Sequence, residues 1–393
     1  MRQSFAPSLG ESMSEWRPVT LGSVTSNYDA KRRPVKTTQR IAGPYPYYGA
    51  SGIIDYVEDF VLDGDYLLIA EDGENLRTRS TPVAFLASGK LWVNNHAHVV
   101  TGNHLADTRF LSHLLSITDV SGYLTGSTQP KLTRSAMDSI ALQVPSIETQ
   151  RAIAEVLGAL DDKIAANTKL ARLSLEISSA IFQSHVRVIA RSASTFLDLA
   201  KISGGGTPST KVPEFWDGDI NWATPSDVTA LAGPYLRSTS RRISDEGLQA
   251  CSSSLFQTGA ILMTSRATIG AFAMAQTATA VNQGFIVVEP IHEYMRYWLF
   301  HEMHSRVDEF LSLANGATFL ELSRGNFKKL PVRLAEPEVL NSFAEVAGSL
   351  HSSAAAAHRE NETLAETRDA LLPQLMSGKL RVRDAETAVE AVV

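Results

Sequence analysis

Cysteine is almost missing from this sequence: its 393 residues include one, Cys251. A single cysteine excludes an internal disulfide and any metal site built from several thiolates. No apolar run approaches the ~20 residues of a membrane-spanning helix. The opening residues MRQSFAPSLGESMSEW also lack the apolar core of a signal peptide. We therefore expect a cytoplasmic protein that does not interact with membranes.

Catalytic motifs are missing as well. The glycine-rich stretch Gly204–Thr210 has no Gly-Lys-Ser/Thr and is not a phosphate-binding Walker loop. His301 and His304 are three residues apart, not the four of a helical zinc-protease motif, and we expect them on a helix surface. Ser265 and Cys251 have no recognisable His/Asp context for a nucleophile. The sequence predicts no catalytic site, no metal site and no cofactor bound by this chain.

What the sequence does contain is an internal repeat. Residues 126–170 and 316–364 share one register through their first 35 positions and then slip by about one helical turn. The paired positions include Gly126/Gly316, Thr128/Thr318, Leu132/Leu322, Arg134/Arg324 and Leu160/Leu350. Further upstream, Val93-Asn-Asn-His resembles Val281-Asn-Gln-Gly. The chain is thus predicted to hold two diverged copies of one unit.

Each copy reads as a β-rich domain followed by a long helix. Short β-branched segments such as Tyr66–Ala70 and Ile261–Thr264 are separated by turn residues. Apolar residues then recur at helical spacing, including Leu170, Leu173 and Ile177. The predicted helix seams contain Ile153, Leu157, Leu160, Ile164 and Asn167, and Leu350, Ala354, Ala357, Asn361 and Leu364. Asn167 and Asn361 either fix the register of the pair or lie at fraying edges.

These patterns predict an α+β protein in which the two helices pair as an antiparallel coiled-coil spacer. About 30 helical residues would span ~45 Å, or ~13 base pairs. Two similar domains could then read two unlike DNA half-sites. The predicted segments are a disordered tail (1–14), a first recognition domain (15–147), its helix (148–190), a second domain (191–336), its helix (337–377) and a C-terminal tail (378–393).

Several sequence motifs, together with their order along the chain, resemble those of the specificity (S) subunits of type I restriction–modification enzymes. They are Gly204-Gly-Gly-Thr-Pro-Ser-Thr-Lys, Thr264-Ser-Arg-Ala-Thr-Ile-Gly, Ala280-Val-Asn-Gln-Gly, Gln150-Arg-Ala-Ile-Ala-Glu-Val-Leu and Leu371-Leu-Pro-Gln-Leu-Met-Ser-Gly. The resemblance implies two target-recognition domains on double-stranded DNA, two methyltransferase (M) subunits on the helices, and restriction (R) subunits. It places S-adenosylmethionine in the M subunits, and ATP and Mg in the R subunits. The first domain lacks the Gly-Gly-Thr-Pro phrase and has Ser23-Val-Thr-Ser-Asn-Tyr-Asp-Ala-Lys-Arg-Arg-Pro in its place.

DNA contacts should come from basic and amide side chains, because Arg reads guanine and Asn or Gln reads adenine. Arg266, with Ser265 and Thr268, is the strongest candidate for reading a base. Trp216 and Trp222 are expected in the core. The other candidates are Lys31, Arg32, Arg33, Tyr47, Tyr48, Ser51, Asn75, Arg77, Asn94, Asn95, His96, Lys131, Thr207, Ser209, Thr210, Lys211, Asn282 and Gln283. For His96, a buried position with satisfied hydrogen bonds is an equal alternative.

Two other function classes stay open at this point. One is a coiled-coil scaffold that joins proteins without reading DNA. The other is an enzyme whose site has no recognisable motif. The net charge of −6 argues mildly against a chain that coats nucleic acid by itself.

If the helices set the distance between the half-sites, inserting one heptad into each should lengthen the spacer by ~10 Å, or ~3 base pairs. The methylated DNA motif of the assembled complex reports that gap. A gap that stays unchanged in a complex that still methylates DNA would contradict a ruler function.

Overall fold

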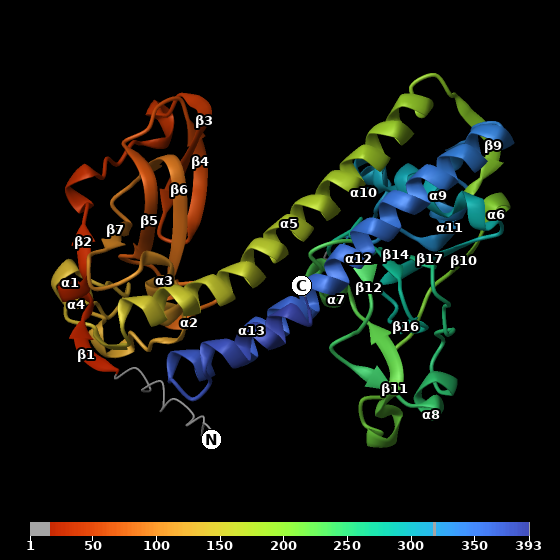
Figure 1. Cartoon of the computed structure of the whole chain (residues 1–393). Coiled ribbons are helices and arrows are strands. Elements are labelled where there is room, and N and C mark those ends of the chain that lie inside the picture. The colour runs from red at the N-terminus through yellow and green to blue at the C-terminus, as the bar shows by residue number, and fades with distance from the viewer. Residues whose placement is uncertain (1–15, 317–319, 393) are drawn as a thin grey trace, which may run out of the picture. The chain divides into compact units, whose positions relative to one another are not determined.

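The computed structural model describes residues 16–316 and 320–392. The chain divides into two compact units, residues 1–164 with 363–393, and residues 165–362. Both long helices cross the division, so each unit contains one β-rich domain and one end of each helix (Figure 1). The predicted tail 1–14 lies outside the described residues.

The first unit is built on a six-stranded sheet of order β2-β7-β5-β6-β3-β4, with helix α3 packed on strands β5, β6 and β7. A separate two-stranded ladder, β1-β8, leads into the long helix α5. The elements are β1 (Arg17–Thr20), α1 (Leu21–Val24), β2 (Thr25–Asn27), η1 (Asp29–Lys31), η2 (Thr37–Gln39), β3 (Ala42–Gly49), β4 (Gly52–Val57), β5 (Leu62–Ala70), α2 (Asn75–Thr78), β6 (Ala84–Val93), β7 (Ala97–Gly102), α3 (Thr108–Ile117), η3 (Ser121–Tyr123), α4 (Arg134–Asp138), β8 (Ala141–Val144) and α5 (Ile147–Val186).

The second unit repeats this plan with shorter strands. Its sheets have the orders β10-β17-β14-β15-β12, β13-β11-β16 and β18-β9. The elements are β9 (Arg191–Thr195), α6 (Phe196–Leu199), β10 (Ala200–Ser203), η4 (Pro213–Phe215), β11 (Trp216–Ala223), α7 (Pro225–Thr229), β12 (Tyr235–Leu236), β13 (Arg242–Ile243), α8 (Asp245–Gln249), β14 (Ile261–Thr264), β15 (Phe272–Ala275), β16 (Thr279–Val281), β17 (Phe285–Pro290), η5 (Glu293–Met295), α9 (Arg296–His304), α10 (Val307–Ser312), α11 (Arg324–Lys328), β18 (Pro331–Arg333) and α12 (Pro337–Met376). α13 (Val382–Glu390) belongs to the first unit.

The repeat extends to strand pairing and helix caps. The first domain has one parallel pair, β3 with β6, in which Tyr48 faces Val93. The second domain has an equivalent parallel pair, β11 with β16, in which Ala223 faces Val281, and an additional one, β12 with β15. Each domain also starts with a short helix behind a capping box, which satisfies free backbone N–H groups at the helix start. The first box begins at Thr20 and the second at Thr195. The two domains are therefore two versions of one topology, as the sequence repeat predicts.

The ends of α5 and α12 pair antiparallel inside each unit. In the first unit, the Arg368 guanidinium lies 2.8 Å from a carboxylate oxygen of Asp161. In the second unit, the rings of Phe182 and Phe343 lie 6.1 Å apart. The predicted seam residues that are buried are Ile153, Leu157, Leu160, Asn167, Ala354, Ala357 and Leu364; Ile164, Leu350 and Asn361 are half-buried.

Both seam asparagines bond to the facing helix. The Asn167 amide donates to Glu360 at 2.8 Å, and the Asn361 amide donates to Thr168 at 3.1 Å. Polar contacts at one level of a helix pair favour a single register, since any slip would break them. The two residues thus fit the register-fixing alternative.

Part of the apolar pattern predicted for the first helix is not in the core. Leu170, Leu173 and Ile177 are 49%, 38% and 49% exposed. Leu173 and Ile177 follow Leu170 by three and seven residues, so the three side chains form one apolar stripe along α5. Apolar periodicity alone does not distinguish a core face from a face that waits for another molecule.

The predicted C-terminal tail contains a helix. Ala385 and Val389 of α13 are buried, in the same core as Leu371 and Leu375 of α12. No described helix has the length and apolarity to cross a bilayer.

The expectation that His301 lies on a helix surface is wrong. His301 is buried, and its Nε2 lies 2.8 Å from Ser178 Oγ and 3.1 Å from His351 Nε2. Nδ1 of His351 lies 2.9 Å from the hydroxyl of Tyr235. Burial, with the nearby histidines, lowers the pKa of His301 to about 3, and burial lowers that of His351 to about 4. Both rings are therefore neutral at pH 7.

This buried pair should make the second unit acid-sensitive. Both folded pKa values lie below the ordinary value of about 6.5, so the unfolded chain takes up protons first as the pH falls. The free energy of unfolding should decline from pH 7 to 5 by roughly 2 kcal/mol per histidine. Urea titrations at both pH values measure this. His301→Gln with His351→Gln should flatten the decline, whereas His104→Gln, at an exposed site, should not; equal slopes in all three chains would contradict the assignment.

Candidate nucleic-acid interface

The chain leaves the central strand of each domain along the same backbone path. Glu71 follows β5, and Ser265 follows β14. In the first domain, Glu71 N donates to His96 O in the β6–β7 turn at 2.9 Å, and Glu71 O accepts from Leu132 N at 2.8 Å. In the second domain, Ser265 N donates to Gly284 O in the β16–β17 turn at 2.8 Å, and Ser265 O accepts from Leu322 N at 3.0 Å. In this shared frame, Asn94, Asn95 and His96 of the first domain correspond to Asn282, Gln283 and Gly284 of the second.

Asn94 and Asn282 build the turn. Each side-chain oxygen accepts a hydrogen bond at 2.8 Å from the backbone N–H two residues later. Asn94 is buried and Asn282 is half-buried. Their side chains are thus engaged within the protein, in a turn that asparagine favours, while the next residues, Asn95 and Gln283, are exposed.

The glycine run packs against the protein and leaves no room for a phosphate. Gly204, Gly205 and Gly206 are all buried, and a Cβ on Gly205 would collide with the Val281 carbonyl oxygen. Gly206 N donates to that oxygen at 3.0 Å, just as Arg33 N donates to Val93 O at 3.1 Å. The carbonyl oxygens of Gly206 and Arg33 in turn accept hydrogen bonds from the indole N–H groups of Trp222 and Trp92. The run is therefore the counterpart of Lys31-Arg-Arg, which lies within the longer stretch, 23–34, predicted from the sequence.

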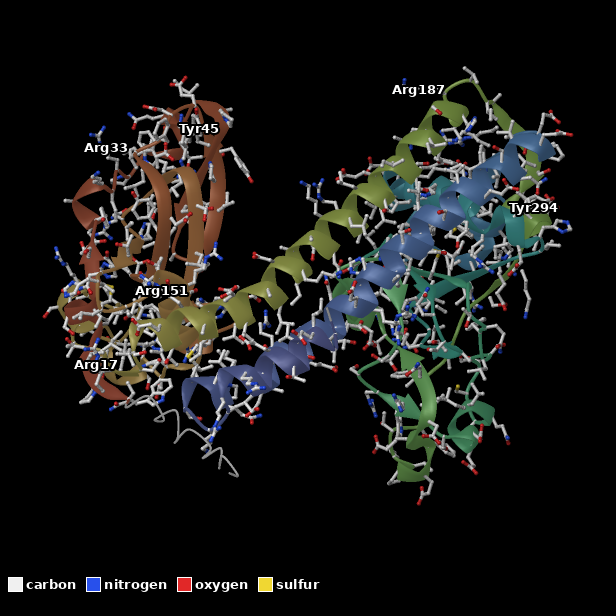
Figure 2. All side chains as sticks on the ribbon, viewed as in Figure 1. Arg17, Arg33, Tyr45, Arg151, Arg187 and Tyr294 are labelled. Atoms are coloured by element: carbon white, nitrogen blue, oxygen red, sulfur yellow. The ribbon has the colours of Figure 1, made fainter. Side chains whose placement is uncertain are left out.

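Polar side chains gather around each frame. We call Arg33, Asp72, Asn95, His96 and Lys131 the first polar edge. The Arg33 backbone is fixed by the bonds above while its side chain is exposed and extends outward from the domain (Figure 2). His96 Nδ1 lies 2.8 Å from an oxygen of Asp72. Lys131 Nζ lies 3.2 Å from Glu71, whose pKa is lowered because bonds from Arg32 and Lys131 and the charge of His98 outweigh its burial.

The second polar edge consists of Thr207, Arg266, Gln283, Glu321 and Arg324. Thr207 Oγ1 donates to the side-chain oxygen of Gln283 at 2.7 Å, so two predicted contacts lie together. Arg266 pairs with Glu321 at 2.9 Å, and Arg324 lies over Gly204. Each of the five side chains is at least partly accessible.

Other sequence candidates have internal roles. Arg32 is paired with Glu71 and also donates to Ala97 O at 3.1 Å. Tyr47 is 1% exposed, and its hydroxyl accepts from Val35 N at 2.9 Å. The Asn75 side-chain oxygen accepts a hydrogen bond from Thr81 N at 2.8 Å, and the Arg77 guanidinium donates to Gly126 O at 3.0 Å. These side chains have protein partners, which makes them weak candidates for DNA contacts.

The remaining candidates differ in exposure. Ser265 is buried and contributes its backbone to the frame, and Tyr48 is half-buried. The exposed ones are Lys31, Ser51, Thr268, Ser209, Thr210 and Lys211.

Sequence reasoning missed Asp72, Glu321 and Arg324 of the polar edges. It also missed two arginines with partners inside the protein. Arg241 lies over the Trp216 ring, 3.5 Å from its centroid, on one side of the buried Trp216–Trp222 pair. Arg79 donates to the carbonyls of Thr118 and Ser116 and so closes the end of α3. No local pattern marks either one, because their partners lie tens of residues away in the sequence.

Comparison with known proteins now adds a family. The model of the type I restriction modification DNA specificity domain matches residues 13–174 and 194–338. The chain belongs to this family. Each matched range contains one polar edge and the first residues of the long helix that follows it, α5 or α12, so the family repeat coincides with the structural repeat.

Individual relatives agree with this membership. The MjaIX specificity subunit of Methanocaldococcus jannaschii is 34% identical over 42% of this chain, and the HindI specificity subunit of Haemophilus influenzae is 21% identical over 94%. In the MjaIX match, and in one to S.HindORF215P of Haemophilus influenzae, the chain spans 39% and 37% of the relative's length. The crystal structure of a type I S subunit from M. genitalium has the same fold, with a TM-score of 0.67 over 94% of this chain and 98% of its own, at 13% identity.

In this family member, Gly205→Ala should destabilise the second domain by about 3 kcal/mol, the upper end for overpacking a buried site. The reason is the collision with a backbone oxygen, which a side-chain rotation cannot relieve. Gly325→Ala in helix α11 is the matched control, because a Cβ there would meet only Ser323 Oγ, at an unstrained 3.9 Å. Urea unfolding of both variants measures the difference. A Gly205→Ala chain as stable as its control would reopen the interpretation of the run as a ligand loop.

Proposed function

We propose that this chain is the DNA-specificity subunit of a type I restriction–modification complex, and that its two domains read two unlike halves of one split target. The observation that carries the proposal is the shared backbone frame with different side chains on its two polar edges. One frame gives both domains the same way of meeting DNA. Different donors and acceptors at matching positions give each domain a different sequence.

The proposed partners are double-stranded DNA, two M subunits and R subunits. The chain itself would hold no cofactor: S-adenosylmethionine would act in the M subunits, and ATP with Mg in the R subunits. The net charge of −6 gives the chain little general attraction to DNA. Most phosphate contacts in the complex would then come from its partners.

We further propose that the helices dock an M subunit, and the apolar stripe of Leu170, Leu173 and Ile177 supports this. Exposed apolar residues are common when single, but a continuous row on one helix face suits a helix or groove of another protein. The row lies on α5 in the second unit, next to the buried seam of the helix pair.

Methylation mapping tests the function. The chain would be co-expressed with its M subunits in a host free of DNA methylation, and modified adenines read by long-read sequencing. We expect a split motif, with two different half-sites on either side of a fixed gap of undefined bases. A stable complex that methylates no defined motif would overturn the proposal and favour a scaffold.

Leu173→Glu together with Ile177→Glu should prevent recovery of the M subunit with this chain. Burying either carboxylate in an apolar interface without a partner would cost several kcal/mol, enough to lower affinity by more than 100-fold. Arg172→Gln, an exposed change on another face of the same helix, is the control and should leave recovery unchanged. Full recovery with the double variant would mean that M subunits bind elsewhere.

A further inference from the structure

The two polar edges carry opposite charges at equivalent positions. Asp72 and Arg266 each follow the frame residue, Glu71 or Ser265. Each also forms a backbone bridge with the residue before Leu132 or Leu322: Asp72 with Lys131 and Arg266 with Glu321. The first domain therefore has an acid after the frame residue and a base as its bridge partner, whereas the second domain has the base first and the acid as partner. Because the backbone hydrogen bonds match, the reversal lies in the side chains alone.

In the second domain, this position presents hydrogen-bond donors. The side chains of Arg266 and Glu321 are 44% and 43% exposed, and an ion pair that exposed contributes at most about 1 kcal/mol. The pair is thus a poor source of stability, and Arg266 can leave Glu321 at little cost. Ala267, the next residue, has a left-handed φ of 58°, which is unfavourable for alanine and sets the direction in which the loop leaves Arg266.

In the first domain, the same position presents an acceptor. The Asp72 carboxylate lies 2.8 Å and 3.0 Å from His96 Nδ1 through its two oxygens. An ionised carboxylate only accepts hydrogen bonds, so this contact places the ring proton of a neutral His96 on Nδ1. Nε2 is then a lone-pair acceptor. The His96 side chain is 49% exposed, which leaves that nitrogen accessible.

We propose that His96, held in this tautomer by Asp72, accepts a hydrogen bond from the exocyclic amino group of cytosine or adenine, at the position where Arg266 donates to guanine in the other half-site. In the major groove, guanine offers two acceptors, while cytosine and adenine offer an amino donor. His96 contacts the base and Asp72 is its positioning residue. The inference rests on the proposed function and adds which class of base each domain reads at one position.

Methylation mapping of variant complexes tests it. His96→Ala should relax one amino-base position of one half-site, lowering preference there about 5- to 150-fold. Arg266→Ala should relax one guanine in the other half-site by a similar factor and leave the first unchanged. His104→Ala, an exposed histidine of the first domain away from the polar edge, is the control and should keep the full motif.

Asp72 is tested by a conservative pair of changes. Asp72→Ala should relax the same base as His96→Ala, because the ring loses the group that fixes its proton. Asp72→Asn keeps an oxygen that can accept from Nδ1, and the base preference should return. A purely structural role would instead lower methylation at all sites together. Co-purification with M subunits verifies that each variant is folded.

Several outcomes would overturn the inference. An unchanged motif with His96→Ala, or a uniform loss across all sequences, would remove His96 from base reading, while a split wild-type motif would still uphold the proposed function. A His96→Ala effect on the half-site that Arg266 reads would contradict the equivalence of the edges. A wild-type complex without any split motif would remove both proposals together.

Discussion

The antiparallel pairing of helix ends inside each unit is the constraint on which the rest of the structure depends. Neither β-rich domain closes its core alone. The first buries Leu364, Leu371 and Leu375 of α12 beside Leu157 and Leu160 of α5, and the second buries Phe182 beside Phe343. Burial of an aliphatic side chain contributes about 1.5–3 kcal/mol, so these contacts outweigh any single polar contact at the surface. Each domain is consequently fixed to one end of each helix, and its polar edge has a defined position relative to those two ends.

The division of labour between backbone and side chains follows from these energies. The frame around Glu71 and Ser265 consists of backbone hydrogen bonds and a turn-forming asparagine in both domains. Its side chains at the polar edges make exposed pairs, such as Arg266 with Glu321, that contribute little to folding. A position that contributes little to stability can exchange acid for base without loss of the fold. This allows one topology to present donors in one domain and acceptors in the other, which is what two unlike half-sites require.

The sequence predicts the helices and the repeat well, because both depend on patterns repeated over many residues. The helices predicted at 148–190 and 337–377 are observed at Ile147–Val186 and Pro337–Met376. The site is predicted less completely. Residue type alone selects basic, aromatic and amide side chains, but Arg32, Tyr47 and Asn94 have partners that only the folded structure brings to them. His301 is buried where a surface position is expected, and the stripe from Leu170 to Ile177 is exposed where a core position is expected. Helical periodicity does not tell which face meets the core and which meets another molecule.

The central claim is that matching turns of the two domains meet DNA in two different half-sites. A photo-reactive side chain introduced in place of Asn95 or of Gln283, the exposed residues of those turns, tests this most directly in the assembled complex on its methylated target. The account predicts that each position cross-links to duplex DNA, Asn95 in one half-site and Gln283 in the other. Cross-links from both positions to the same half-site, or to protein alone, would contradict it.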